Sequence, residues 1–231
     1  MPKISLIIPL YNNQATIKEC LNSIFSQSFE DFEIIVVNDG SSDKSLEILK
    51  EYGDKLKIIN QKNQGAPVAR NNGFKESLGK YLLFCDADVV LRKKALEKML
   101  YILENHPHAD YVYSSFYWSW KKFELNPFSP AKLKLMPYIH TTSLIKRKYF
   151  PGFSPEIKKF QDWDLWLTML EQGHIGVWIP EVLYTVRTKD GRISSWLPSF
   201  IYKFSKLKSK NIKKYNEAKK IIFNKHNLTI N

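Results

Sequence analysis

The sequence predicts an α/β fold in which a mostly parallel sheet is flanked by helices. Short apolar runs alternate with segments whose apolar residues recur at helical spacing, and the alternation repeats through the first half of the chain. A parallel strand pair needs a crossover connection, which helices of this length provide. With 231 residues and 44% hydrophobic composition, the chain can bury a full core as one large α/β domain or as two fused lobes.

The first four strands are predicted from apolar runs that end at polar residues. They cover residues 4–8, 32–37, 56–60 and 81–85. Helices are predicted over residues 14–26, after the capping residues 41–43, over residues 66–77 and over residues 93–104. Because strands and helices alternate, the sheet should be largely parallel and covered on both faces.

The second half of the chain has a different pattern. Strands are predicted over residues 111–116, 140–145 and 177–187, and a helix over residues 162–172. Residues 117–120 are predicted to begin an irregular aromatic stretch. Residues 126–137 contain three prolines and are predicted to form a mobile loop.

The carboxylate pair Asp86 and Asp88 is the most informative feature of the sequence. It follows the strand predicted at residues 81–85, at the edge where open α/β sheets bind ligands. Alternate residues of an extended segment point the same way, so the two carboxylates can act together. Divalent cations prefer oxygen ligands and retain waters and phosphates, so one or two carboxylates suffice for a metal–diphosphate site. The alternative is an acidic turn or helix cap.

Further motifs follow in order along the chain. They are Ile-Ile-Pro-Leu-Tyr-Asn at residues 7–12, Val-Val-Asn-Asp-Gly-Ser-Ser-Asp at residues 36–43, and the segment at residues 63–73 that enters a helix. With the acidic pair, these motifs resemble the nucleotide-sugar-binding half of family 2 glycosyltransferases, inverting enzymes of the GT-A fold. Phe-Gln-Asp-Trp-Asp-Leu-Trp-Leu at residues 160–167 looks like the Glu-Asp segment that supplies the catalytic base in that family. The resemblance covers residues 3–195.

The resemblance implies a GT-A fold, with a Rossmann-like, mostly parallel sheet and a C-terminal basic helical extension. Residues 1–110 would form the nucleotide-sugar-binding half and residues 111–195 the acceptor-binding half of the same domain. Residues 196–231 would form a basic amphipathic helical tail.

The resemblance also assigns roles to individual residues. Asp162 would be the catalytic base, and Asp88 would hold the metal ion, Mn²⁺ or Mg²⁺. Asp39 can contact the base and ribose, and the Arg70 guanidinium can neutralise a diphosphate. The nucleotide-sugar site is expected to comprise Pro9, Tyr11, Asn12, Asp39, Gly65, Arg70, Asp86 and Ala87.

The chain departs from the family pattern at three positions. Asn38 stands where Asp is usual, Gln161 where Glu is usual, and Thr168 where Arg is common. The second departure leaves Asp162 alone as the candidate base. The sequence contains no Gln-x-x-Arg-Trp motif, which argues against a processive polymerase.

Some of these residues have a structural alternative. Asp39 could form a turn with Gly40, and Asp164 is expected to be structural because it lies on a different face of the helix from Asp162. Trp163 and Trp166 are expected to anchor the core.

Four aromatic or histidine residues carry no single assignment. Trp118 and Trp120 could contact an acceptor or a membrane, or could pack. His140 and His174 each occur singly, and no role is assigned to either.

The expected function is that of an inverting, metal-dependent hexosyltransferase. It would move a sugar from a nucleotide-sugar donor, expected to be a UDP-sugar, to a saccharide or lipid-linked acceptor in cell-surface glycan synthesis. A sugar-1-phosphate nucleotidylyltransferase is the nearest enzymatic alternative. Enzymes of that class typically carry a Gly-rich loop with a Lys or Arg just after the first strand. In this chain, residues 9–13 after the first predicted strand are Pro-Leu-Tyr-Asn-Asn, which does not match that pattern.

The net charge of +12 suggests a nucleic-acid-binding protein as an alternative of another class. However, residues 196–231 contain nine Lys and one Glu, a net charge of +8, so the first 195 residues carry only +4. We therefore expect no nucleic-acid partner. The tail also has apolar residues at helical spacing, which suits an anionic membrane surface or a helix packed on the domain.

The sequence predicts a cytoplasmic protein that could associate peripherally with the inner face of the cell membrane. It has no apolar run of 18 residues and no signal-peptide pattern at its start. Its two cysteines are too few for a disulfide framework.

Overall fold

The computed structural model describes residues 1–187 and 210–228. The strands are β1 (Ile4–Leu10), β2 (Phe32–Asn38), β3 (Lys57–Asn60), β4 (Tyr81–Phe84), β5 (Val89–Leu91), β6 (Tyr111–Trp118), β7 (Lys121–Phe123), β8 (Leu144–Lys146) and β9 (Gly176–Val186). The α-helices are α1 (Ile17–Phe25), α2 (Ser45–Lys50), α3 (Ala66–Lys75), α4 (Ala95–Asn105), α5 (Pro130–Leu135), α6 (Gln161–Glu171) and α7 (Lys210–Lys225). Two short 3₁₀ helices cover Gly53–Lys55 and Arg147–Tyr149.

The described strands form one nine-stranded sheet in the order β3-β2-β1-β4-β8-β6-β9-β5, with β7 paired to β6. β1, β2, β3 and β4 are parallel to one another, as predicted, and β6 is parallel to β9. β8 is antiparallel to both β4 and β6, and β5 is antiparallel to β9. The parallel part of the sheet therefore comes from the first half of the chain, and the second half adds a mixed part.

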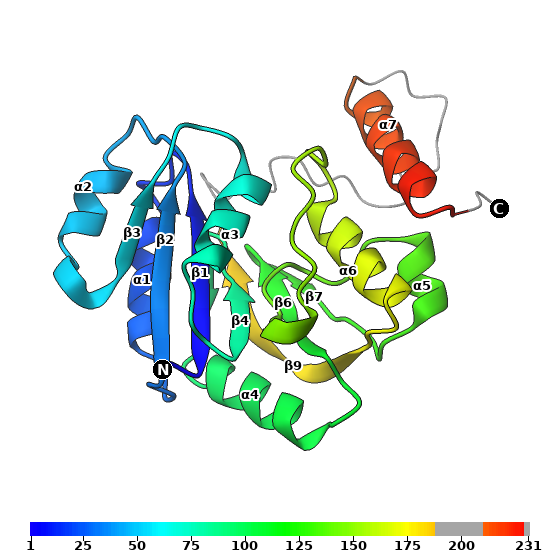
Figure 1. Cartoon of the computed structure of the whole chain (residues 1–231), viewed down its shortest axis with the longest axis horizontal. Helices are drawn as coiled ribbons and strands as arrows, with labels where there is room; N and C mark the ends of the chain where they lie inside the picture. Colours follow the sequence, from blue (N-terminus) through cyan, green and yellow to red (C-terminus); the bar gives the residue numbers. More distant parts are fainter. Residues whose placement is uncertain (188–209, 229–231) are drawn as a thin grey trace.

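Helices cover both faces of the parallel strands (Figure 1). α3 lies in front of β1 and β2, and α1 lies behind them. Ile4, Leu6 and Ile8 of β1 are fully buried, as expected for a central strand covered on both sides. The loops after β1, β2 and β4 meet at the carboxyl edge of these strands.

The prediction of a mobile loop over residues 126–137 is wrong, because this segment contains the helix α5 (Pro130–Leu135). Ser129 caps the helix by accepting a hydrogen bond from the Lys132 N–H through its side chain. Pro130 occupies the first turn, where a missing N–H costs nothing. The three prolines suggested a loop, but one of them starts a helix.

Residues 117–120 also differ from the prediction of an irregular stretch. Tyr117 and Trp118 continue β6, which pairs with β7. The strand predicted at residues 140–145 begins only at Leu144, because His140 bonds locally: its carbonyl accepts from the Ser143 hydroxyl and its Nδ1 from the Thr142 N–H. The short strand β5 was not predicted.

Trp163 and Trp166 of α6 are core anchors, as predicted. Both are fully buried, and each indole N–H has a carbonyl partner. Trp163 donates to the carbonyl of Leu133 at 2.6 Å, and Trp166 donates to the carbonyl of Ile139 at 3.0 Å. These bonds fix α6 and so fix Asp162 at its start.

The described part of the predicted tail is α7, and its C-terminal end packs on the domain. Ile222 and Phe223 are buried, and the Phe223 ring lies 5.9 Å from the ring of Trp163. The lysines Lys213, Lys214 and Lys220 are exposed. Of the two alternatives for the tail, membrane contact and packing on the domain, packing therefore holds for this end. Residues 196–209, which carry most of the apolar pattern of the tail, lie outside the described residues. Within the described residues, the helices are too short or too polar to cross a lipid bilayer.

Candidate active site

A cavity of about 250 Å³ lies at the carboxyl edge of the parallel strands. Its lining residues are Pro9, Leu10, Tyr11, Asn13, Asp39, Ala66, Arg70, Asp86, Ala87 and Asp88. Seven of the nine residues predicted for donor and metal binding are in this set. The exceptions are Asn12 and Gly65. The structure thus brings most of the predicted donor site together.

Arg70 reaches the cavity from α3, which lies unusually close to β1. A Cβ added at Gly73 would be 2.5 Å from Cγ2 of Ile7, so only glycine permits this approach. Arg70 is 5% exposed, and its guanidinium lies 5.1 Å from the ring centre of Phe153. The helix therefore delivers a buried, permanently charged group to the cavity.

The Arg70 guanidinium joins two parts of the site. Nη2 donates to Oδ1 of Asp86 at 2.6 Å, and Nη1 donates to Oε1 of Gln161 at 2.8 Å. Burial raises the pKa of Asp86, but the charge and hydrogen bond of Arg70 outweigh it, so the pKa lies below its ordinary value. Nε of Arg70 is buried and has no hydrogen-bond partner within the described residues.

Asp88 lies two residues beyond Asp86, is partly buried and lines the same cavity. Its backbone carbonyl accepts a hydrogen bond from the Arg187 N–H at 2.7 Å, which ties this turn to the end of β9. No cluster of three His, Cys, Asp or Glu side chains suited to a metal occurs among the described residues. The carboxylates of Asp86 and Asp88 fit a hard cation that takes its other ligands from water and phosphate.

Asp39 organises the loop that leads into α3. It is 3% exposed, and its carboxylate accepts hydrogen bonds of 2.8 Å from Nε2 of Gln61, the Gln64 N–H and the Gly65 N–H. Gly65 has a φ of 90°, a conformation that favours glycine. Gly65 therefore shapes the entrance to the helix without lining the cavity.

Asn12 does not line the cavity either. Its Oδ1 accepts a hydrogen bond of 2.8 Å from the Ser42 N–H, so it joins the loop after β1 to the loop after β2. Its neighbour Asn13 lines the cavity instead.

Asp162 lies in the first turn of α6 and is partly buried. It does not line the cavity, but Gln161 beside it accepts the hydrogen bond from Arg70. Burial raises the pKa of Asp162 above its ordinary value, and the opposing effects of His140 and the Trp163 N–H are smaller. A carboxylate with a raised pKa is a stronger base than an ordinary one.

His140 is a residue whose place near the carboxylates sequence reasoning missed. The Thr142 N–H donates to its Nδ1 at 3.1 Å, so Nδ1 carries a lone pair and the neutral ring carries its proton on Nε2. The ring packs against both Phe116 and Tyr184, whose ring centroids lie 5.3 and 5.5 Å from its own. Burial lowers the pKa of His140, against the charges of Asp86 and Asp162. A single histidine in sequence gives no signal of this placement.

Asp164 is structural, as predicted. It is 2% exposed, and it accepts hydrogen bonds from the Ser154 hydroxyl at 2.7 Å and from Nε2 of His226 at 2.9 Å. Lys225 lies 2.8 Å from its Oδ1. The side chain thus points away from the candidate site and holds α7.

Comparison with known proteins decides the family. The model of the family described as "Glycosyl transferase family 2" matches residues 5–161. The chain belongs to glycosyl transferase family 2. EpsE of Bacillus subtilis (strain 168), which carries a glycosyltransferase name, is 30% identical over 203 residues, and the alignment covers 80% of this chain and 73% of EpsE. The enzyme class of this family 2 member, glycosyltransferase, follows from these matches.

Solved structures share its fold. The crystal structure of S. aureus TarS 1-349 in complex with UDP has a TM-score of 0.71 and 22% identity, covering 87% of this family 2 chain and 62% of that chain. The mannosyltransferase PcManGT from Pyrobaculum calidifontis, in complex with GDP-Man and Mn²⁺, has a TM-score of 0.64 and 20% identity, covering 80% and 56%. The predicted GT-A fold is therefore confirmed. The chain spans about three-fifths of the length of each of these two structures.

Proposed function

We propose that this family 2 glycosyltransferase transfers a sugar, with inversion, from a UDP-sugar to a hydroxyl group of a saccharide or lipid-linked acceptor. The observation that carries the proposal is the placement of Arg70, which bonds Asp86 of the cavity and Gln161 beside Asp162. One buried cation thus joins the expected donor site to the helix turn that carries the expected base.

The donor would occupy the cavity at the carboxyl edge of the parallel strands. Asp39 and the loop it organises would contact the base and ribose, with Asp86 on the ribose side. Arg70, which lines the cavity, would offset part of the diphosphate charge. TarS has been crystallised with UDP, which supports a uridine nucleotide here.

The metal requirement is proposed from the same residues. Asp88 would hold Mn²⁺ or Mg²⁺, whose charge would stabilise the departing diphosphate when bound. PcManGT has been crystallised with Mn²⁺, which supports this choice of cation.

The chemical step would depend on Asp162. Its carboxylate would take the proton from the acceptor hydroxyl while that oxygen bonds to the anomeric carbon from the face opposite the diphosphate. The bond between the anomeric carbon and the diphosphate oxygen breaks in the same step, and UDP leaves with the electron pair. The raised pKa of Asp162 makes it suited to accept this proton.

His140 would assist as a hydrogen-bond donor. Its Nε2 has no hydrogen-bond partner within the described residues and is not among the fully buried unpaired atoms. Because its tautomer is fixed, Nε2–H can donate to a substrate oxygen near Asp86 and Asp162.

The acceptor would bind to residues 111–195, with residues 1–110 forming the donor half. A peripheral position at the cytoplasmic membrane face would bring a lipid-linked acceptor within reach, and the exposed lysines of α7 suit an anionic surface.

Separate incubations of the protein with radiolabelled UDP-sugars and with radiolabelled GDP-sugars, each with Mn²⁺ and an extract of lipid-linked glycans, test the proposal. Transfer of label to the acceptor, with release of UDP and a β-linkage from an α-linked donor, is the expected result. Transfer with retained configuration would contradict the assigned mechanism, and use of non-uridine donors alone would contradict the assigned nucleotide.

A further inference from the structure

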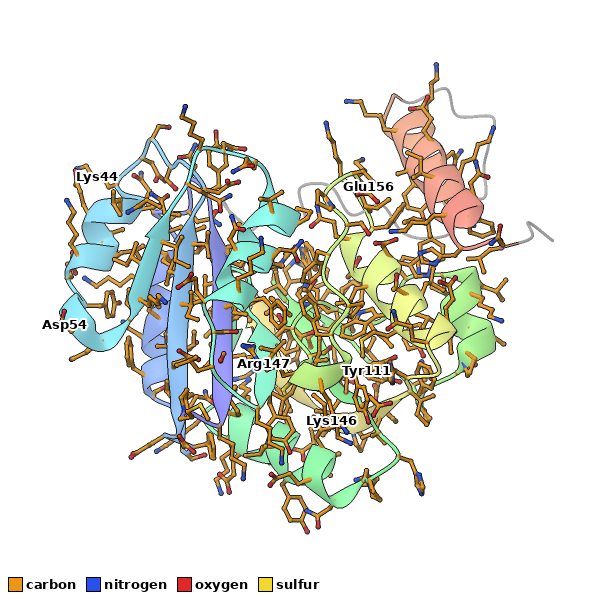
Figure 2. The ribbon with its side chains drawn as sticks, viewed as in Figure 1. Lys44, Asp54, Tyr111, Lys146, Arg147 and Glu156 are labelled. Carbon is orange, nitrogen blue, oxygen red and sulfur yellow. The ribbon has the colours of Figure 1, made fainter. Side chains whose placement is uncertain are left out.

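A second cavity, of about 380 Å³, lies at the opposite end of β4 from the candidate active site. Its lining residues are Lys80, Tyr81, Lys146, Arg147 and Lys148. Tyr81 is the first residue of β4 and pairs with Lys146 of β8, whereas Asp86 follows the last residue of the strand. Figure 2 labels Lys146 and Arg147 in the lower half of the view, toward the end of the sheet at which the chain begins. The length of β4 separates this cavity, which we call the basic cavity, from the donor site.

The positive charge of the basic cavity is mostly not neutralised by the protein. Among the described residues, Lys80, Arg147 and Lys148 form no ion pair with a carboxylate. Lys146 is 3.9 Å from Asp110, but that carboxylate also bonds His174 at 3.0 Å. Three side-chain cations therefore gather at one hollow without a carboxylate partner.

The Arg147 guanidinium is fixed by neutral groups. It donates to the hydroxyl of Ser77 at 2.8 Å and to the Ser77 carbonyl, and it lies 4.8 Å from the ring centre of Phe74. Glu33 forms no ion pair with it among the described residues, and Oε1 of Glu33 instead accepts hydrogen bonds from the Leu78 and Gly79 N–H groups. The guanidinium thus keeps its charge available in a fixed position.

Both flanking lysines lie over aromatic rings. Nζ of Lys80 is 5.5 Å from the ring centre of Tyr81, and Nζ of Lys148 is 4.4 Å from that of Tyr149. The Tyr81 hydroxyl donates to Glu104, and burial with this carboxylate raises the pKa of Tyr81 to about 12, so its ring stays neutral. Most of the cavity surface is apolar. Cations held over rings lose less freedom when an anion binds.

We propose that the basic cavity is a binding site for a phosphate or diphosphate group that is distinct from the donor site. A group with two or more negative charges matches three unneutralised cations, and both guanidinium and ammonium donors form charge-assisted hydrogen bonds to phosphate oxygens. The apolar surface suits a carbon body attached to that group. A soluble phosphorylated molecule and a lipid headgroup share this chemistry.

Titration of inorganic pyrophosphate into the ¹⁵N-labelled full chain, without divalent cations, tests the site directly. We expect amide shifts at residues 80–81 and 146–148. Lys80→Gln with Lys148→Gln should weaken this binding about tenfold or more, because each removes a charge-assisted hydrogen bond. Both lysines are exposed, so the double variant should fold as the wild type does. The matched control is Lys50→Gln with Lys134→Gln, two exposed lysines outside both cavities.

Vesicles separate the two sources of phosphate. Co-sedimentation with phosphatidylcholine vesicles containing phosphatidic acid, lost in the Lys80/Lys148 variant and kept in the Lys50/Lys134 variant, would identify a lipid headgroup. Pyrophosphate binding without such vesicle binding would identify a soluble ligand. The proposal is overturned if pyrophosphate shifts only residues near Asp86 and Asp88 and vesicles bind both variants alike.

Discussion

Asp86 and Asp162 both lie near Arg70, yet their surroundings move their pKa values in opposite directions. Arg70 outweighs the burial of Asp86 and lowers its pKa, whereas burial dominates at Asp162 and raises its pKa. A pair of carboxylates separated in this way can take different roles, one remaining charged and the other accepting a proton. The environment of each residue therefore supports Asp162 rather than Asp86 as the base.

Asp162→Asn should lower kcat by about a hundredfold or more, because positioned proton transfer contributes that much. The amide can still accept the Trp163 N–H, so folding and UDP binding should persist. Initial rates across pH provide a second measurement. Transfer by the wild type should decline as pH falls through the pKa of Asp162, which lies above 3.8, and the variant should lack this decline. Normal turnover by the variant would remove Asp162 from the mechanism.

His140→Phe should reduce transfer by about tenfold, since it removes a hydrogen-bond donor but keeps a ring packed against Phe116 and Tyr184. Steady-state kinetics measures the change in kcat and KM, and circular dichroism checks the fold. His108→Phe is the control, because His108 is exposed. Unchanged kinetics for His140→Phe would mean that Nε2 contacts no substrate.

At the scale of elements, the approach of α3 to β1 sets the position of Arg70. Gly73→Ala would place a methyl group 2.5 Å from Cγ2 of Ile7 and 3.1 Å from Cγ2 of Val37. We expect a loss of about 1–3 kcal/mol in the free energy of unfolding, as for other overpacked cores, together with lower activity. Denaturant unfolding measures the first effect, and Lys75→Ala, at the exposed end of α3, is the control. Wild-type stability in Gly73→Ala would show that the helix can move without cost.

The parallel strands and their helices were predictable from sequence because their apolar periodicity is strong and their ends carry Gly, Asn or Asp. The motifs at the strand ends also contain most of the residues that line the cavity, since parallel strands bring their carboxyl ends to one edge. Asn12 and Gly65, also expected to contact the nucleotide, do not line the cavity, and their local hydrogen bonds join the loops around it, so their contact with the nucleotide stays a prediction. α5 was missed because proline is typical of loops as well as of helix starts. The position of His140 depends on tertiary packing, which no local pattern encodes.

At the scale of the whole molecule, a buried polar cluster attaches α7 to α6. The two ring nitrogens of His226 lie 2.8 Å from Oε1 of Glu171 and 2.9 Å from Oδ1 of Asp164. Only the doubly protonated ring can donate to both carboxylates. Burial lowers the pKa of His226, but the hydrogen bonds that its ring donates to these carboxylates outweigh the effect of burial and raise the pKa above 6.5.

This cluster should make the attachment of α7 depend on pH. Because the pKa is raised in the folded protein, the stabilisation is fully present below about pH 6.5 and is lost as pH rises through the folded pKa. Amide hydrogen exchange of α7, measured across this range, should show faster exchange at higher pH than base catalysis alone explains. His226→Gln should remove this dependence and cost about 1–3 kcal/mol at pH 6, whereas His108→Gln should not. A His226→Gln variant with the same pH profile as the wild type would contradict the assignment.

The central claim is that the cavity at the carboxyl edge of the sheet binds a nucleoside diphosphate with a cation held by Asp88. Isothermal titration of UDP into the full chain, with and without Mn²⁺, tests this claim most directly. We expect tight binding by the wild type only when Mn²⁺ is present, and weak binding by Asp88→Ala whether or not Mn²⁺ is present. Equal enhancement of UDP binding by Mn²⁺ in the wild type and in Asp88→Ala would contradict the account.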